Sequence, residues 1–215
     1  EDALNILSDE SFTAPLKLRK NNYGNDIIDP IMFPAEIKKQ IISKYGDNIE
    51  FVPLIVIRNQ ADLIYSQYVE EYNLKKYKNI DLLFNDKGII DLAGFEIYNF
   101  YKYISKLESV FGEGKSNVFL FEDWIENFDF CCHRLAHIMG IEFNLVRDSL
   151  LNKHINKKKK SSKGYYTKDG SELIPFLNYN QKLQIKSFFN EDNLKLQDFL
   201  GIHTETIKQK YISNA

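Results

Sequence analysis

Cysteine is scarce in this chain, and its two cysteines, Cys131 and Cys132, are adjacent. Neighbouring cysteines rarely pair with each other, and two cannot build a disulfide framework, so we expect a reducing compartment. The chain is rich in asparagine, yet it contains no Asn-x-Ser/Thr acceptor site, which disfavours a secretory history. Together these absences predict a cytoplasmic location.

Long apolar runs and an excess of either charge are also missing. No run approaches the roughly 18 residues that a membrane-spanning helix needs, so we expect no membrane segment. Lys and Arg number 28 against 30 Asp and Glu, and the resulting net charge of -2 makes nucleic acid an unexpected partner. The 215 residues are 44% hydrophobic, which is enough for one domain with a substantial core.

Several catalytic and metal-binding signatures are absent as well. The chain has no Gly-x-Ser-x-Gly elbow, no Cys-x-x-Cys pair and no Gly-x-Gly-x-x-Gly fingerprint, so hydrolase, zinc-site and dinucleotide-binding functions lack support. His133 and His137 lie one helical turn apart, but both are expected to face solvent and no third ligand is evident, so we expect no metal.

The segment Gly112-Glu-Gly-Lys-Ser116 ends like a Walker A loop. It lacks the first glycine of that motif, and it precedes a strand instead of following one. We therefore predict a turn, and a P-loop kinase activity would lack its phosphate-binding lysine.

Apolar runs and helical periodicities alternate along the chain. Gly and Pro positions and residue spacing predict strands over 52–57 and 117–121 and helices over 34–45, from 59, over 97–111, 122–139, 172–189 and 192–200. We expect the strand at 52–57 to be buried on both faces, as in a parallel sheet, and 164–170 to be a loop. The alternation predicts an α/β fold with a mostly parallel sheet.

Arg58 stands directly after the first of these strands and Ser66 lies about two helical turns further on. Ligands of open α/β sheets bind beyond the carboxyl ends of the strands. Asn59 is placed to cap the helix that follows, with Asp62 reaching back as in a capping box. An arginine and a hydroxyl at a helix N-terminus suit an anion. The alternative is that Arg58 pairs with a surface carboxylate and Ser66 is an ordinary helical serine.

The pattern of strand, Arg58, Asn59 and Ser66 resembles the 3'-phosphate-binding segment of sulfotransferases that use 3'-phosphoadenylyl sulfate (PAPS). In that family the arginine and the serine eight residues later both contact the 3'-phosphate of the nucleotide. Gln60 stands where the family usually has proline. The resemblance implies a three-layer, P-loop-NTPase-like α/β fold with helices on both sides of the central sheet.

Other segments resemble the carbohydrate sulfotransferases in the same order along the chain. They are Asn5–Phe12, Phe119–Trp124, Lys160–Gly164, and Phe188–Leu196 with Gly201. The resemblance implies that Ser162, Lys163 and Gly164 hold a nucleotide phosphate, whereas the earlier lysines of the basic stretch 152–163 are expected to be mostly solvated. PAPS would be the donor co-substrate, and a saccharide or glycoconjugate hydroxyl the acceptor.

The resemblance also names a general base. Sulfuryl transfer needs a group that takes the proton of the acceptor hydroxyl. Glu10 occupies the position that the family's carbohydrate enzymes use, and Asp9 beside it is the rival candidate. Glu122 and Asp123, after the second strand, are expected to cap the next helix.

One family element has no counterpart here. The loop that holds the 5'-phosphosulfate, typically Lys-x-Gly-Thr-Thr, is not found, and the family's order would place it before Ala3. We therefore expect residues 1–215 to form a single sulfotransferase-like domain truncated at its N-terminus, weakly active or inactive alone. The alternative is a non-catalytic nucleotide- or glycan-binding module of the same fold. The sequence does not indicate an oligomeric state.

Overall fold

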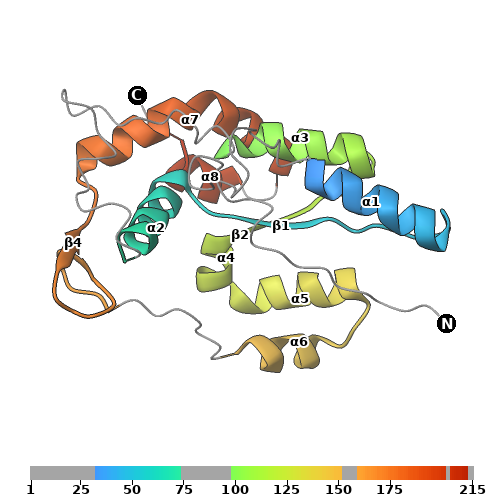
Figure 1. Ribbon diagram of the computed structural model, residues 1–215, viewed down its shortest axis with the longest axis horizontal. Coiled ribbons are helices and arrows are strands. Elements are labelled where there is room, and N and C mark those ends of the chain that lie inside the picture. Colours follow the sequence, from blue (N-terminus) through green and yellow to red (C-terminus); the bar gives the residue numbers. More distant parts are fainter. Residues whose placement is uncertain (1–31, 74–97, 152–158, 202–203, 213–215) are drawn as a thin grey trace. The chain divides into compact units, whose positions relative to one another are not determined.

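The computed structural model describes residues 32–73, 98–151, 159–201 and 204–212 (Figure 1). Eight helices are seen in these ranges: α1 (Met32–Tyr45), α2 (Gln60–Asn73), α3 (Phe100–Phe111), α4 (Phe121–Glu126), α5 (Phe128–Met139), α6 (Phe143–Leu150), α7 (Tyr179–Leu200) and α8 (Thr204–Lys210). The strands are β1 (Leu54–Ile57), β2 (Asn117–Leu120), β3 (Gly164–Tyr166) and β4 (Leu173–Pro175). Glu10, Asp9 and the segment Asn5–Phe12 lie outside the described residues.

The two central strands, β1 and β2, pair in parallel. The Asn117 backbone N–H donates to the Pro53 carbonyl at 2.8 Å, just before the strands run side by side. Parallel pairing brings the carboxyl ends of the two strands to the same edge of the sheet. The α/β class is therefore confirmed as a mostly helical chain with a small parallel sheet.

Strand β1 was predicted to be buried on both faces, and this prediction is wrong. Ile55 and Ile57 are buried, whereas Leu54 and Val56 expose 43% and 49% of their surface. An apolar run without alternation usually marks a strand covered on both sides. The apolar run correctly predicted a strand, but tertiary packing buries only alternate side chains of β1.

The described chain divides into two compact units. The first contains α1, β1, α3, residues 117–119 of β2, residues 189–200 of α7, and α8. The second contains α2, Leu120, α4, α5, α6, the β3–β4 pair and residues 179–188 of α7. The single-domain expectation remains a prediction.

Helix α3 and the second half of α7 meet in the first unit. Helix α3 ends before Gly112, as predicted, and buries Phe100, Tyr103, Ile104 and Leu107. The Asp192 carboxylate accepts the Tyr101 and Lys102 amides at 2.9 and 3.1 Å, which satisfies backbone donors in the first turn of α3. Burial raises the pKa of Asp192 despite these two hydrogen bonds.

Helix α7 is one continuous helix, so the expected break between 189 and 192 is wrong. The two predicted helices, 172–189 and 192–200, left residues 190 and 191 outside a helix. Instead, Asn193 is fully buried and donates to the Tyr211 carbonyl at 3.1 Å, and Asp192 binds the start of α3. Tertiary partners therefore hold polar side chains within the helix.

Helices α4, α5 and α6 form a small cluster in the second unit. The predicted helix 122–139 is interrupted at Asn127, and α5 ends at Gly140, whose φ of 65° is the left-handed conformation expected after a helix. Cys132, Ala136 and Val146 form the core of the cluster, with Trp124, Phe128, Leu135, Ile141 and Phe143 packed around it.

The region 164–175 forms an antiparallel strand pair, which corrects two expectations. Residues 164–170 were expected to be a loop, which is wrong for 164–166 and correct for the turn at 167–170, and 172–189 were expected to be a helix. The structure pairs Gly164 with Pro175 and Tyr166 with Leu173, and helix α7 begins only at Tyr179. Pro175 lacks the N–H that a helix interior needs, but it is tolerated at a strand end.

Candidate functional site

The candidate site is built on the residues that follow β1 and β2. Arg58 follows β1, and Phe121 follows β2. The Arg58 guanidinium carbon lies 4.8 Å from the centroid of the Phe121 ring, which is a cation–π geometry. Among the residues that the structure describes, no carboxylate forms an ion pair with Arg58. The surface ion pair considered as the alternative for Arg58 is therefore not seen in this part of the chain.

Asn59 caps helix α2, as the sequence predicts, but Asp62 reaches back to the Asn59 side chain and not to its backbone N–H as in a capping box. Its side-chain oxygen accepts the Asp62 amide at 3.0 Å, and its side-chain nitrogen donates to the Asp62 carboxylate at 2.9 Å. The Asn59 carbonyl accepts the Leu63 amide at 3.0 Å, the first backbone bond of the helix. The cap satisfies donors that a helix start otherwise leaves open.

Glu122 is a site residue that sequence reasoning missed. We expected it to cap the next helix, but its carboxylate accepts both the backbone N–H and the side-chain NH₂ of Asn59, at 3.0 and 2.9 Å. Both residues are buried, with 6% and 8% of their surface exposed. A signal was present in the sequence, because polar residues following two neighbouring parallel strands meet at one edge of the sheet.

Ser66 lies in the second turn of α2 and is half-buried. The residue before it, Tyr65, connects α2 to the hairpin, since its hydroxyl donates to the Ile174 carbonyl at 2.8 Å. The Tyr65 ring stacks on Tyr165 with centroids 5.9 Å apart. Burial raises the pKa of Tyr65 to about 12, so this hydroxyl stays protonated and remains a donor at neutral pH.

Gly164 lies close against the backbone of the opposite strand of the hairpin. A Cβ at this position would lie 2.0 Å from the Ile174 carbonyl oxygen, the same oxygen that accepts the Tyr65 hydroxyl. The glycine is therefore required by packing. Gly164 is also one of the predicted phosphate-binding residues. Ile174 and Tyr65 connect it to helix α2, which carries Ser66.

Ser162 and Lys163, at the start of the hairpin, are exposed. The Lys163 and Gly164 amides both donate to the Ser161 hydroxyl oxygen, at 3.1 and 3.2 Å. A phosphate bound by these amides would have to replace that hydroxyl. Lys160, earlier in the basic stretch, lies over the Phe176 ring with its nitrogen 5.5 Å from the centroid.

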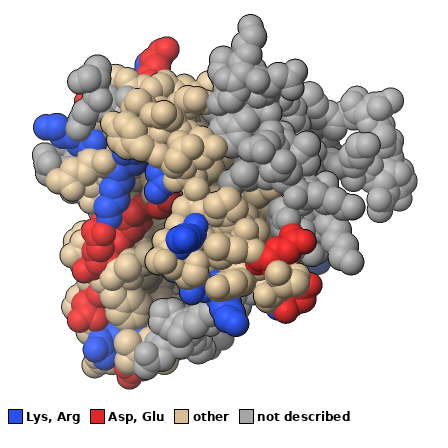
Figure 2. Space-filling model, turned by 90° about the vertical axis from the view of Figure 1, so that its left-hand side faces the viewer, with Lys and Arg blue, Asp and Glu red and all other residues tan. Residues whose placement is uncertain are grey.

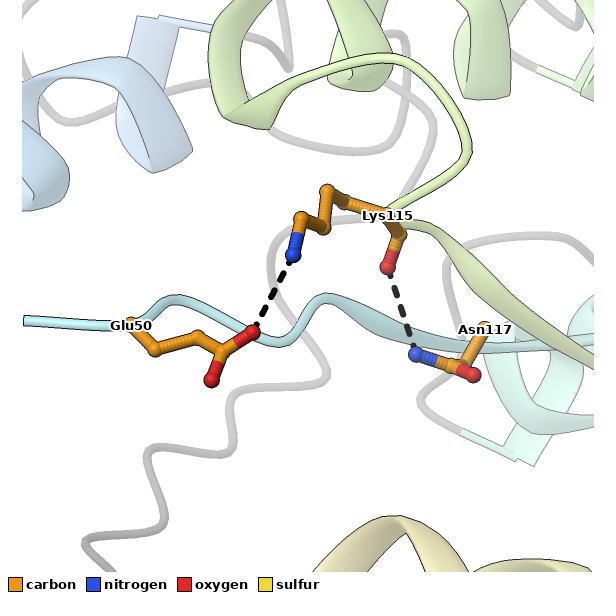
Figure 3. Close-up of polar contacts among 3 residues, drawn as sticks. All are labelled: Glu50, Lys115 and Asn117. Atoms are coloured by element: carbon orange, nitrogen blue, oxygen red, sulfur yellow. Dashed lines mark hydrogen bonds and ion pairs between the residues drawn. The ribbon is translucent and has the colours of Figure 1, made fainter.

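The Walker-like segment is a turn, as predicted. Gly112 and Gly114 have positive φ angles, and the Lys115 amide donates to the Gly112 carbonyl at 3.3 Å. The Lys115 ammonium pairs with Glu50 at 3.1 Å, and Asn117 donates to the Lys115 carbonyl (Figure 3). This lysine lies at the amino end of β2, whereas Arg58 follows the carboxyl end of β1.

His133 and His137 are exposed, as expected. The His133 ring stacks on Phe143 with centroids 3.7 Å apart and planes within 4°. In the described part of the chain, no three His, Cys, Asp or Glu side chains gather as metal ligands would. Acidic and basic side chains lie close together on the face that Figure 2 shows.

None of the helices within the described ranges combines the length and hydrophobicity that a bilayer crossing requires. A comparison of the chain with protein-family models found no match, and a comparison with curated proteins found no relative.

Proposed function

We propose that this chain is a PAPS-dependent sulfotransferase domain with a three-layer, P-loop-like α/β architecture. It transfers a sulfuryl group from PAPS to a hydroxyl of a saccharide or glycoconjugate. The observation that carries the proposal is Arg58 directly after β1, with its guanidinium carbon 4.8 Å from the Phe121 ring centroid and the capped start of α2 next in the chain. That arrangement fits the sequence resemblance around Arg58 and Ser66.

In this proposal the 3'-phosphate of the donor binds beyond the end of β1. Arg58 supplies a planar, permanently charged fork that matches phosphate oxygens. Ser66 adds a hydroxyl donor from α2, and the N-terminus of α2 adds its positive dipole end. Ser162, Lys163 and Gly164 approach from the hairpin, which Tyr65 fastens to the same helix.

The chemical step moves the sulfuryl group between two oxygens. The acceptor hydroxyl oxygen attacks sulfur, and the bond between sulfur and the bridging oxygen of the 5'-phosphate breaks. The hydroxyl proton passes to Glu10, or to Asp9 as the rival base. The products are a sulfate ester and adenosine 3',5'-bisphosphate.

The test compares two nucleotides that differ only in the 3'-phosphate. Calorimetry with the protein measures the dissociation constants of adenosine 3',5'-bisphosphate and adenosine 5'-phosphate. Because a hydrogen bond to a charged group contributes about 1.5–3 kcal/mol, Arg58→Ala should weaken bisphosphate binding by roughly ten- to a hundredfold. The affinity for adenosine 5'-phosphate, which lacks the 3'-phosphate, should change little.

Lys115→Ala is the matched control, since it removes another cation at the other end of the strands. It should leave both affinities unchanged. Equal affinity of the unsubstituted protein for the two nucleotides would rule out the 3'-phosphate site. Nucleotide binding without sulfate transfer from PAPS would indicate the non-catalytic binding module.

A further inference from the structure

Two consecutive residues after β2 hold two consecutive residues after β1. Phe121 lies under the Arg58 guanidinium, and Glu122 accepts both donor groups of Asn59. The two pairs stand in matching order, the first residue after each strand with the first, and the second with the second. Phe121 thus contacts the Arg58 side chain, and Glu122 binds the N–H of the peptide that joins Arg58 to Asn59.

The contact between Glu122 and Asn59 fixes the peptide that follows Arg58. A peptide unit is planar, so the direction of the Asn59 N–H sets the plane that includes the Arg58 carbonyl and Cα. The Glu122 oxygen accepts this N–H at 3.0 Å. A second bond, from the Asn59 side chain to the same oxygen, keeps the carboxylate in place. The orientation of the peptide that follows Arg58 is therefore restrained.

Asn59 has no spare hydrogen-bonding group with which to relax. Its backbone N–H and carbonyl, its side-chain oxygen and its side-chain NH₂ all take part in the bonds described above. Since the residue is 8% exposed, breaking one of these bonds would leave a buried polar group without a partner. Any movement of the strand end would have to break several bonds together.

Phe121 restricts the other end of the arginine. The face of the ring attracts the guanidinium, whose carbon lies 4.8 Å from the ring centroid, and a guanidinium carries five N–H donors for a phosphate. Phe121 is 37% exposed, so its ring lies at the surface, where a ligand can reach the arginine. A pre-oriented fork loses less entropy when it binds a phosphate than a freely rotating one.

We propose that Phe121 and Glu122 are positioning residues for Arg58. They act by fixing the orientation of the arginine fork toward the 3'-phosphate, and they do not contact the nucleotide themselves. This inference rests on the proposed function, because it assigns the arginine its phosphate ligand.

The test is a set of double-mutant cycles with the two nucleotides as probes. The readout is the 3'-phosphate preference, defined as the dissociation constant of adenosine 5'-phosphate divided by that of adenosine 3',5'-bisphosphate. Glu122→Ala should reduce this preference about tenfold, and Phe121→Leu about fivefold. Glu122→Gln and Phe121→Tyr, which keep the acceptor oxygen and the ring, should stay within about twofold of the unsubstituted protein.

In an Arg58→Ala background, neither substitution should reduce the preference further, because the group that they orient is gone. Ile125→Ala is the matched control on α4, where Ile125 is 69% exposed, and it should leave the preference unchanged. If Phe121 and Glu122 only stabilised the fold, substituting them would weaken the binding of both nucleotides equally. The ratio of the two dissociation constants would then stay unchanged. If Glu122→Ala does not fold, as judged by circular dichroism, the comparison of Phe121→Leu with Phe121→Tyr decides the matter.

The outcomes separate the inference from the function on which it depends. An unsubstituted protein without any 3'-phosphate preference overturns the proposed function and the inference with it. A clear preference that Arg58→Ala removes, but that Phe121→Leu leaves intact, overturns the inference alone. The inference alone is also overturned if the loss of preference caused by Phe121→Leu or Glu122→Ala adds fully to the loss caused by Arg58→Ala.

Discussion

The two ends of the parallel strand pair carry similar residue types in different surroundings. At the amino end of β2, Lys115 and Glu50 form an ion pair in which the two side chains expose 52% and 72% of their surface. At the carboxyl ends, Arg58 lies on an aromatic ring and Asn59 is buried against Glu122. The amino end contains the recognisable motif residues Gly-Lys-Ser, whereas the carboxyl end contains the better organised polar site.

This comparison shows why a motif needs its structural context. A solvated ion pair contributes little, because water competes for both charges and the flexible side chains lose entropy. A buried polar network is costly to leave incomplete, so its geometry is tightly specified. If the comparison is right, equivalent substitutions should have much larger effects after the strands than before them.

The largest difference is expected between two asparagines, Asn59 after β1 and Asn117 at the start of β2. Asn59→Ala removes a helix cap and takes one of the two donors from the Glu122 carboxylate, so unfolding should become easier by about 2–4 kcal/mol. Asn117→Ala removes only an exposed 3.2 Å bond to the Lys115 carbonyl and should cost less than about 0.5 kcal/mol. Urea unfolding followed by circular dichroism measures both, and similar costs would break the comparison.

The next largest effect concerns two glycines with different reasons to be glycine. Gly164→Ala places a Cβ against the Ile174 backbone and should cost about 3 kcal/mol, because neither backbone can easily move. Gly114 has open space around it and a φ of 69°, so Gly114→Ala should cost about 1 kcal/mol of backbone strain.

Substitution by asparagine sharpens this second comparison. Asparagine tolerates the left-handed conformation, so Gly114→Asn should recover part of the loss, whereas Gly164→Asn should be at least as harmful as alanine. Thermal unfolding of the four variants provides the ranking. Recovery at Gly164 would show that its close approach to Ile174 does not limit the residue.

The smallest effect is expected for the ion pair between Lys115 and Glu50. Lys115→Ala, Glu50→Ala and the double variant should give a coupling of about 0.5 kcal/mol, falling further in 1 M salt. A salt-independent coupling above about 2 kcal/mol would mean that the amino end is organised as strongly as the carboxyl end.

Local chemistry was sufficient to predict several elements of this fold. Gly112 and Gly140 correctly marked helix ends, the strand before Arg58 was found from its apolar run, and Asn59 was identified as the cap of α2. Each of these features depends on residues close together in the chain. Their energetics are set by backbone conformation and local hydrogen bonds.

The errors arose where distant residues decide the outcome. The strand pair at 164–175 depends on the fit of Gly164 against Ile174 and on Tyr65, about a hundred residues earlier in the chain. The continuous helix α7 depends on partners for Asp192 and Asn193 from other elements. No periodicity within either segment carries that information.

The sequence by itself therefore determined the α/β class, the position of Arg58 after a strand and the start of helix α2. Tertiary structure alone decided that Phe121 and Glu122 meet Arg58 and Asn59, because parallel pairing brings two strand ends 63 residues apart in sequence to one edge. Residue type and local backbone preference follow from the sequence around each position. Burial and the choice of hydrogen-bond partner are fixed only when the strands pair, and these properties turn an arginine at a strand end into a candidate phosphate site.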